Sequence, residues 1–173
     1  MSDQVRIQFR KATHNDLAVL KQWDEDPSVI DSDPMGEWNW EAELAKDPDW
    51  REFLMAEAEG VPIGFLQIID PGLEETHYWG DIGPGFRAID IWIGSPAWRN
   101  RGMGTAMMRE ALKRCFAPAD VHTVLVDPLQ SNTGACRFYE RLGFEFVEDR
   151  MFDEDACRVY QLSRATWESR VDK

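Results

Sequence analysis

The chain has 173 residues, of which 43% are hydrophobic and 12% aromatic, and its formal net charge is −13. This length and composition predict one globular domain, residues 1–173, and exclude low-complexity and repeat architectures. The acidic balance disfavours nucleic acid and anionic membranes as partners and favours cationic ligands, although acidity also serves solubility alone. No signal peptide follows Met1 and no apolar run reaches the roughly 18 residues of a membrane span, so we expect a cytoplasmic protein.

The first predicted elements are a strand and a capped helix. The segment Val5–Phe9 alternates apolar and polar residues, as a half-buried strand does. Thr13 with Asp16 three residues later forms a short capping box, so a helix should begin there and end before Pro27.

Residues 31–50 are rich in acids and tryptophans. Tryptophan faces can cover sugar rings and carboxylates can pair with ammonium groups, so the segment is typical of a lining for a sugar or amine ligand. A helix over Trp40–Lys46 that packs its indoles on the core is an equally good interpretation. The residues concerned are Asp31, Asp33, Glu37, Trp38, Trp40, Glu41 and Glu43.

Two further strands, Phe53–Ala58 and Pro62–Ile69, are predicted around a turn at Glu59 and Gly60. A long polar insertion, Asp70–Phe86, follows them. A loop of this length inside a compact domain is more often functional than idle. Its acids and aromatic rings would suit a cationic sugar.

The centre of the chain combines a strand, a glycine-rich loop and a helix. The strand Arg87–Gly94 carries one carboxylate, Asp90, which is costly to bury unless it is paired or functional. The loop reads R-x-x-G-x-G from Arg99 to Gly104 and opens a helix, Gly102–Phe116, whose first N–H groups and dipole form an anion site. A pyrophosphate would fit there, although a simple turn with a solvated basic edge gives the same pattern.

Beyond this helix we expect a strand at Val121–Val126 that ends at Asp127, which is either a ligand for an ammonium group or a turn former. A helix capped by Ser131 or Asn132 should run to Leu142. Two closing strands, 144–152 and 158–162, and a polar tail with one helical turn around Trp167 complete the chain. The three cysteines have no C-x-x-C spacing, and we favour packing over nucleophilic roles for them: Cys115, Cys136 and Cys157.

The R-x-x-G-x-G loop, Asn132 and the run FYERLGF at 138–144 together resemble the acetyl-CoA-binding half of the GCN5-related N-acetyltransferases (GNATs). The runs RAID at 87–90 and VDPxxSN at 126–132 are similar to the aminoglycoside 6'-N-acetyltransferases of that family. The resemblance implies an α/β (α+β) fold. Its central sheet would be mixed, mostly antiparallel, splayed between the fourth and fifth strands and flanked by helices.

The resemblance also implies acetyl-CoA as cosubstrate, direct transfer through a ternary complex, and no metal. It makes Asp90 the base for the acceptor amine and Tyr139 the proton donor to the departing thiolate; Tyr139 could also be a plain helix aromatic. The expected cofactor contacts are Trp92, Ile93, Gly94, Arg99, Asn100, Arg101, Gly102, Met103, Gly104, Thr105, Asn132 and Tyr139. The expected substrate contacts are Trp38, Glu75, Tyr78, Asp90 and Asp127.

The expected activity is acetylation of an aminoglycoside, at its 6'-amino group, which would confer resistance. Other acceptors stay open: a protein N-terminus, a lysine, a polyamine, or a siderophore precursor, for which His77 would be the assisting histidine. A family member that only senses a CoA ester is a third alternative, which the intact loop with Asp90 and Tyr139 disfavours. The expected state is a monomer or a homodimer.

Overall fold

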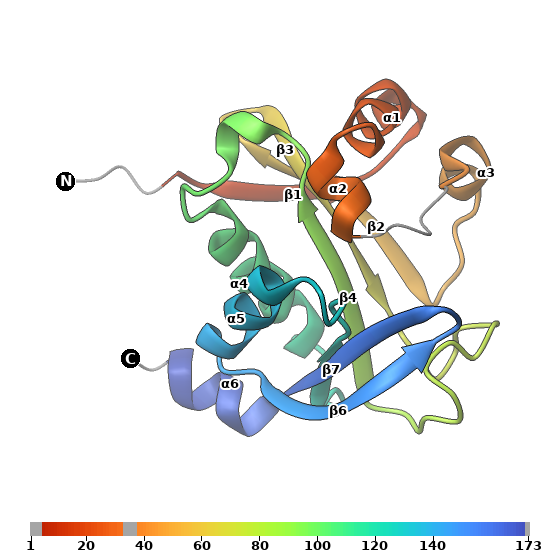
Figure 1. The fold of residues 1–173 in the computed structure, drawn as a ribbon, viewed down its shortest axis with the longest axis vertical. Coiled ribbons are helices and arrows are strands. Elements are labelled where there is room, and N and C mark those ends of the chain that lie inside the picture. Colours follow the sequence, from red (N-terminus) through yellow and green to blue (C-terminus); the bar gives the residue numbers. More distant parts are fainter. Residues whose placement is uncertain (1–4, 33–37, 172–173) are drawn as a thin grey trace. The chain divides into compact units, whose positions relative to one another are not determined.

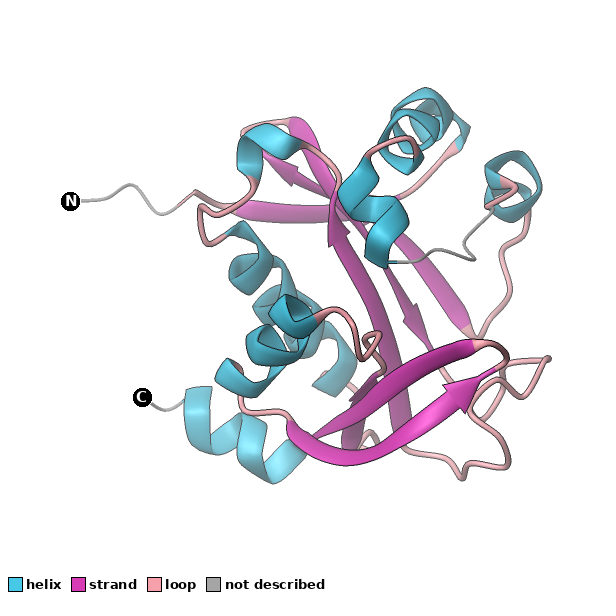
Figure 2. Ribbon diagram, viewed as in Figure 1, coloured by secondary structure: helices cyan, strands magenta, loops and turns pink. Residues whose placement is uncertain are grey.

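The computed structural model describes residues 5–32 and 38–171, so Asp33 and Glu37 lie outside the described part (Figure 1). Within that part, seven strands form one mixed sheet in the order β1-β2-β3-β4-β5-β7-β6. The β4–β5 pair is parallel, the other pairs are antiparallel, and helices flank the sheet (Figure 2). This confirms the predicted fold class.

The strands are β1 (Ile7–Lys11), β2 (Arg51–Ala58), β3 (Val61–Ile69), β4 (Phe86–Ile93), β5 (Thr123–Val126), β6 (Glu145–Phe152) and β7 (Asp155–Ser163). The helices are α1 (Leu17–Asp24), α2 (Pro27–Ser32), α3 (Trp40–Ala45), α4 (Met103–Phe116), α5 (Thr133–Arg141) and α6 (Arg164–Val171). Two short 3-10 helices are η1 (His14–Asp16) and η2 (Pro96–Trp98). The insertion after β3 contains no helix or strand, as expected.

Spatial contacts between residues divide the chain into two compact units. The first comprises residues 1–68 and 90–111, and the second comprises residues 69–89 and 112–173. Strand β4 therefore gives its beginning to the second unit and its end, from Asp90 onward, to the first. The single domain over 1–173 stays a prediction.

The first unit buries side chains on both faces of its strands. One face carries an aromatic cluster in which the ring of Phe65 lies 5.1 Å from Trp40 and 5.3 Å from Phe53. On the other side Met103 and Met107 of α4 pack against aliphatic side chains of the strands. These two methionines are therefore core residues, as the helical spacing predicted.

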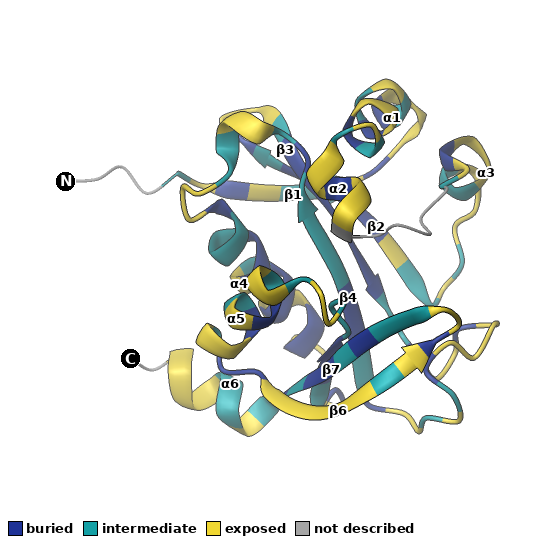
Figure 3. Cartoon of the chain, in the orientation of Figure 1, coloured by how far each residue is buried: buried dark blue, intermediate teal, exposed yellow. Residues whose placement is uncertain are grey.

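The second unit packs around Trp79, Leu125, Phe152 and Val159. Its edge strand β6 is exposed along most of its length (Figure 3). The C-terminal tail forms α6, two turns rather than the single turn expected. Arg164 explains the difference, because its guanidinium donates to the carbonyls at the end of α4 and before β5, and so fixes the start of this helix.

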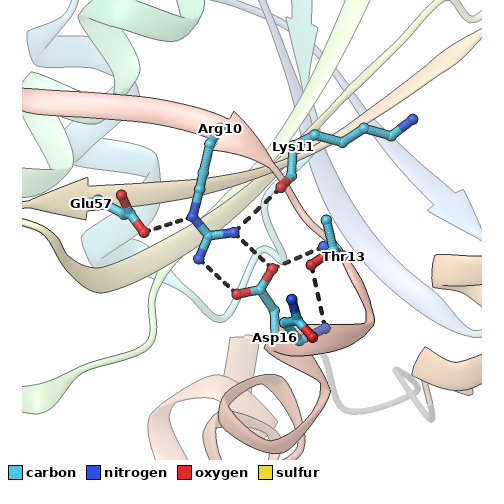
Figure 4. A network of polar contacts seen from close by, with 6 residues as sticks. Arg10, Lys11, Thr13, Asp16 and Glu57 are labelled. Carbon is cyan, nitrogen blue, oxygen red and sulfur yellow. Dashed lines mark hydrogen bonds and ion pairs between the residues drawn. The ribbon is translucent and has the colours of Figure 1, made fainter.

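A network of charged and polar groups holds β1 to the first helical turn (Figure 4). Both terminal nitrogens of Arg10 donate to the Asp16 carboxylate, at 2.7 and 2.8 Å, and its Nε donates to Glu57 at 2.6 Å. Asp16 also accepts from the backbone N–H of Thr13, which confirms the predicted capping box. Burial alone would raise the pKa of Asp16, but the hydrogen bonds from Arg10 and Thr13 hold it below its ordinary value.

Replacing Asp16 by Asn should lower the free energy of unfolding at pH 7 by about 2 kcal/mol, because Arg10 loses its charged partner. The folded-state pKa of Asp16 is depressed, so its contribution is present above the unfolded pKa of about 4 and is lost as the pH falls through the folded value. Urea unfolding of both proteins at pH 7 and below pH 4 should show the difference between them shrinking in acid.

Asp47→Asn is the matched control. Asp47 pairs with Lys11 at 2.6 Å, but both side chains are exposed, at 71% and 63%. Its loss should change the free energy of unfolding by less than about 0.5 kcal/mol. Equal losses in the two variants would contradict a special contribution from the buried carboxylate.

Candidate active site

The candidate base Asp90 is half-buried in β4 and is paired across the sheet with β3. The side-chain amide of Gln67 donates a hydrogen bond from Nε2 to Oδ2 of Asp90. The two strands run antiparallel, with Gly94 N donating to Ile63 O at 3.0 Å. This pairing explains how an apolar strand accommodates a carboxylate.

Asp90 lies beside the aromatic cluster of the first unit, because residues two apart on a strand share a face. Trp92, two residues along β4, has its ring 4.8 Å from Phe65. Trp38 stacks on Trp40 at 5.0 Å and 11°, and its ring lies 6.3 Å from Trp92. Trp38 and Trp92 are only half-buried, while Trp40 is fully buried.

The core-packing interpretation of the tryptophan-rich segment holds for Trp40, and the ligand-lining interpretation stays a prediction for Trp38. Helix α3 packs Trp40 into the core, while Trp38 lies at the partly exposed margin of the cluster, where a ligand contact is feasible. The indole Nε1 of Trp92 is buried without an acceptor in the structure. Such a donor is unusual in a folded protein.

The glycine-rich loop has the geometry of an anion site. Gly102 has a φ of +77°, and a Cβ added there would meet no atom within 4 Å, so the space beside the backbone is open. Helix α4 begins directly afterwards, with Ala106 N donating to Gly102 O at 3.1 Å. The N–H groups at 103–105 precede that bond and have no helical partner, so the residues present fit the pyrophosphate of CoA.

The two arginines of this loop differ in what they contact. Arg99 donates to the carbonyls of Ile93 and Gly94 at 3.2 and 3.3 Å and to Asp26 Oδ1 at 3.2 Å. Its guanidinium therefore fixes the end of β4, a role that sequence reasoning missed. Arg101 is exposed, with its guanidinium 4.8 Å from the ring centre of Trp98. Of the two, Arg101 is the better candidate for a phosphate contact.

In the second unit, a buried carboxylate accepts hydrogen bonds from the backbone of the insertion after β3. This residue was not singled out by sequence analysis. Glu74 is buried and accepts from Thr76 N at 2.7 Å and from Tyr78 N at 3.0 Å. Burial raises the pKa of Glu74, but these backbone donors outweigh burial and hold it below its ordinary value. Glu75, the acid we predicted as a substrate contact, is exposed.

Tyr78 and Asp127, both predicted substrate contacts, are brought together in this unit. The Tyr78 hydroxyl donates to Asp127 Oδ2 at 2.6 Å, and its ring stacks on Phe152 at 4.4 Å. Asp127 is thus more than a turn former. It anchors the insertion to the end of β5.

Two predicted residues of α5 also lie in the second unit. Asn132 caps the helix by accepting from Ala135 N at 3.1 Å, which settles the choice between it and Ser131. Tyr139 is buried, with its ring 5.5 Å from Phe144. The roles of both toward CoA stay predictions. The three cysteines are buried and form no disulfide within the described residues, as expected.

The acetyltransferase (GNAT) domain matches residues 12–152, most of the chain. The chain belongs to this GNAT family. It is therefore an N-acetyltransferase of GNAT type, with acetyl-CoA as cosubstrate. No described helix is long and apolar enough to cross a membrane.

Individual relatives add detail. The aminoglycoside N(6')-acetyltransferase type 1 of Klebsiella pneumoniae is 28% identical over 155 residues, covering 80% of this chain and 74% of that protein. An L-amino acid N-acetyltransferase of Escherichia coli (strain K12) is 27% identical over 147 residues, covering 80% and 83%. The aminoglycoside acetyltransferase AAC(6')-Ib with coenzyme A and kanamycin has a TM-score of 0.84 at 23% identity, covering 97% and 100%. This structural likeness supports the fold.

Substitution of the two loop arginines should separate their roles. Arg99→Gln should lower the free energy of unfolding by about 2 kcal/mol, because backbone carbonyls and Asp26 lose a charged donor. Arg101→Gln should leave stability within about 0.5 kcal/mol but weaken CoA binding about tenfold, the value of one charge-assisted contact. Urea unfolding and calorimetric titration with CoA measure both. The reverse pattern would contradict the assignment.

The neighbouring glutamates of the insertion offer a matched pair, since each change removes one negative charge. Glu74→Gln should speed hydrogen exchange at the amides of Thr76 and Tyr78 about tenfold, because a neutral amide is a weaker acceptor. Glu75→Gln should leave exchange at both amides unchanged. Similar acceleration in both variants would show that charge alone, rather than the Glu74 contacts, orders the loop.

Proposed function

We propose that this protein transfers the acetyl group of acetyl-CoA to an amine of an aminoglycoside, at the 6' position, and thereby confers antibiotic resistance. The observation that carries the proposal is the carboxylate of Asp90, held by Gln67 on the same strand face as the half-buried indole of Trp92, whose ring lies 6.3 Å from that of Trp38. It joins a group that attracts an ammonium to surfaces that cover the apolar faces of a sugar ring.

Electrostatics favours such an acceptor. Aminoglycosides carry several ammonium groups, and a protein with a formal net charge of −13 attracts polycations through its net field. In the second unit, Asp127 and Glu75 are acids that we assign to further ammonium groups, with Tyr78 orienting the carboxylate of Asp127.

The chemistry needs one proton acceptor and one proton donor. Acetyl-CoA supplies the activated acetyl thioester. Asp90 holds the acceptor's ammonium group and takes its proton, directly or through water. The free amine then forms the new C–N bond as the C–S bond breaks, and the acylated nitrogen releases its remaining extra proton to solvent. We assign to the Tyr139 hydroxyl the proton that the departing thiolate receives.

Bringing the amine and the thioester together in one ternary complex would supply much of the rate, and no acyl-enzyme is needed. An ordinary aspartate is a weak base for an amine, so Asp90 has to act through its position. The N–H groups at the start of α4 and Arg101 would hold the pyrophosphate. The backbone N–H of Gly94 already donates a hydrogen bond to Ile63, and the carbonyl of Ile93 already accepts one from Arg99.

A second acceptor class is kept because of one relative, the L-amino acid N-acetyltransferase. An α-amino acid brings its own carboxylate, which a site built on Asp90 would repel unless a cation lay nearby. The same reasoning leaves polyamines, lysines and protein N-termini as cationic alternatives, because each carries an ammonium group without an adjacent acid.

Release of CoA from acetyl-CoA should be measured with kanamycin, tobramycin, spermidine, a lysine peptide and an L-amino acid. We expect turnover with the two aminoglycosides, and a loss of about 10²- to 10⁴-fold in kcat/KM in Asp90→Asn, the usual contribution of a general base. Asp47→Asn, which removes the same charge from an exposed ion pair, should keep full activity.

Turnover confined to spermidine, the peptide or the amino acid would overturn the aminoglycoside proposal and leave the family assignment intact. Full activity in Asp90→Asn would instead remove Asp90 from the chemistry. The two results are independent, because the first concerns the acceptor and the second concerns the base.

A further inference from the structure

We propose that Gln67 is a positioning residue, whose buried amide holds the Asp90 carboxylate in the orientation that receives the acceptor's ammonium group. The inference rests on the proposed role of Asp90 as the base. It goes beyond that role by assigning a function to a residue on the neighbouring strand that has none in the proposed chemistry.

Gln67 is a buried polar residue in an otherwise apolar part of β3. It is 6% exposed, and its neighbours Leu66 and Ile68 on β3 are buried apolar residues. A primary amide loses several hydrogen bonds to water when it is buried, and this is costly unless a protein partner replaces them. The partner recorded for its side-chain nitrogen is Asp90 Oδ2.

The direction of this hydrogen bond gives it chemical meaning. The side-chain nitrogen of glutamine can only donate, so Asp90 Oδ2 accepts. The reverse orientation of the amide would set two acceptor oxygens against each other. An N–H donor in this place is compatible with the carboxylate form of Asp90, which is the form that can bind an ammonium group and take its proton.

The contact also restricts how the carboxylate can turn. A free aspartate samples several side-chain rotamers, and each must be lost when the amine binds. Gln67 on β3 holds Oδ2 of Asp90, and Trp92 lies on the same face of β4. The Asp90 side chain has therefore lost most of its rotamer freedom before the acceptor binds. Small errors in the position of a base have large effects on rate, so removal of the donor should reduce turnover.

A double-mutant cycle tests whether Gln67 acts through Asp90. Gln67→Met keeps the length and approximate volume of the side chain and removes the donor. With the amine that the wild type acetylates, it should lower kcat/KM about tenfold or more. In the Asp90→Asn background the same change should lower kcat/KM less than about twofold, because the group that it positions is already gone.

Two controls separate positioning from structure. The KM for acetyl-CoA should stay within about twofold of the wild type in every variant, since the hydrogen bond that Gln67 donates goes to Asp90 and not to the glycine-rich loop. Gln67→Glu has the same shape, and circular dichroism with urea unfolding checks that both variants are folded before their kinetics are compared. Gln67→Glu replaces the donor by an acceptor and should lose at least as much activity.

Equal losses of kcat/KM in the two backgrounds, or wild-type activity in Gln67→Glu, would overturn the inference. If the acetylated amine proves to be spermidine or a peptide, the aminoglycoside proposal fails while the cycle, run with that amine, still decides the role of Gln67. If no amine is acetylated, both proposals fail, because Asp90 then has no proton to accept.

Discussion

The close approach of β3, β4 and α1 is the constraint on which the candidate site depends. A Cβ on Gly64 would lie 2.5 Å from the carbonyl oxygen of Trp92, and one on Gly94 would lie 1.9 Å from the ring of Trp23. Both distances are far below contact, and backbone or a packed indole cannot move aside cheaply. These glycines let the end of β4 lie flush between a strand and a helix. Asp90 is thereby placed opposite β3 and within reach of Gln67.

The charged groups of the first unit are used in two different ways. Arg10 and Arg99 have most of their donors engaged by carboxylates and backbone carbonyls, so they stabilise junctions between elements. Arg101 is exposed, and its guanidinium makes one long hydrogen bond, of 3.5 Å, to the carbonyl of Ala97. In a chain with so few cations relative to acids, this division matters, because an arginine committed to Asp26 and two carbonyls has little left for a phosphate.

Much of the fold could be predicted from the sequence because its signals are local. The Thr13–Asp16 capping box, the Glu59–Gly60 turn and the glycine that ends α5 each depend on a few consecutive residues. The tail was misjudged because α6 depends on Arg164 reaching the end of α4, far away in the sequence. The contacts of Arg99 with two carbonyls could not be predicted, because its place in the R-x-x-G-x-G motif carries no information about the carbonyls nearby; its phosphate contact stays a prediction.

The candidate site shows even more clearly that contacts between residues far apart in sequence could not be predicted. Asp90 could be singled out as a carboxylate in an apolar strand, but its partner could not, because which residue of β3 faces it depends on the register between two strands. Glu74 and Glu75 are adjacent and identical in type, and only the fold of the loop decides that the first is buried against two amides. Both failures have one cause. A polar side chain is buried only where the tertiary structure supplies its partner, and the partner is rarely close in sequence.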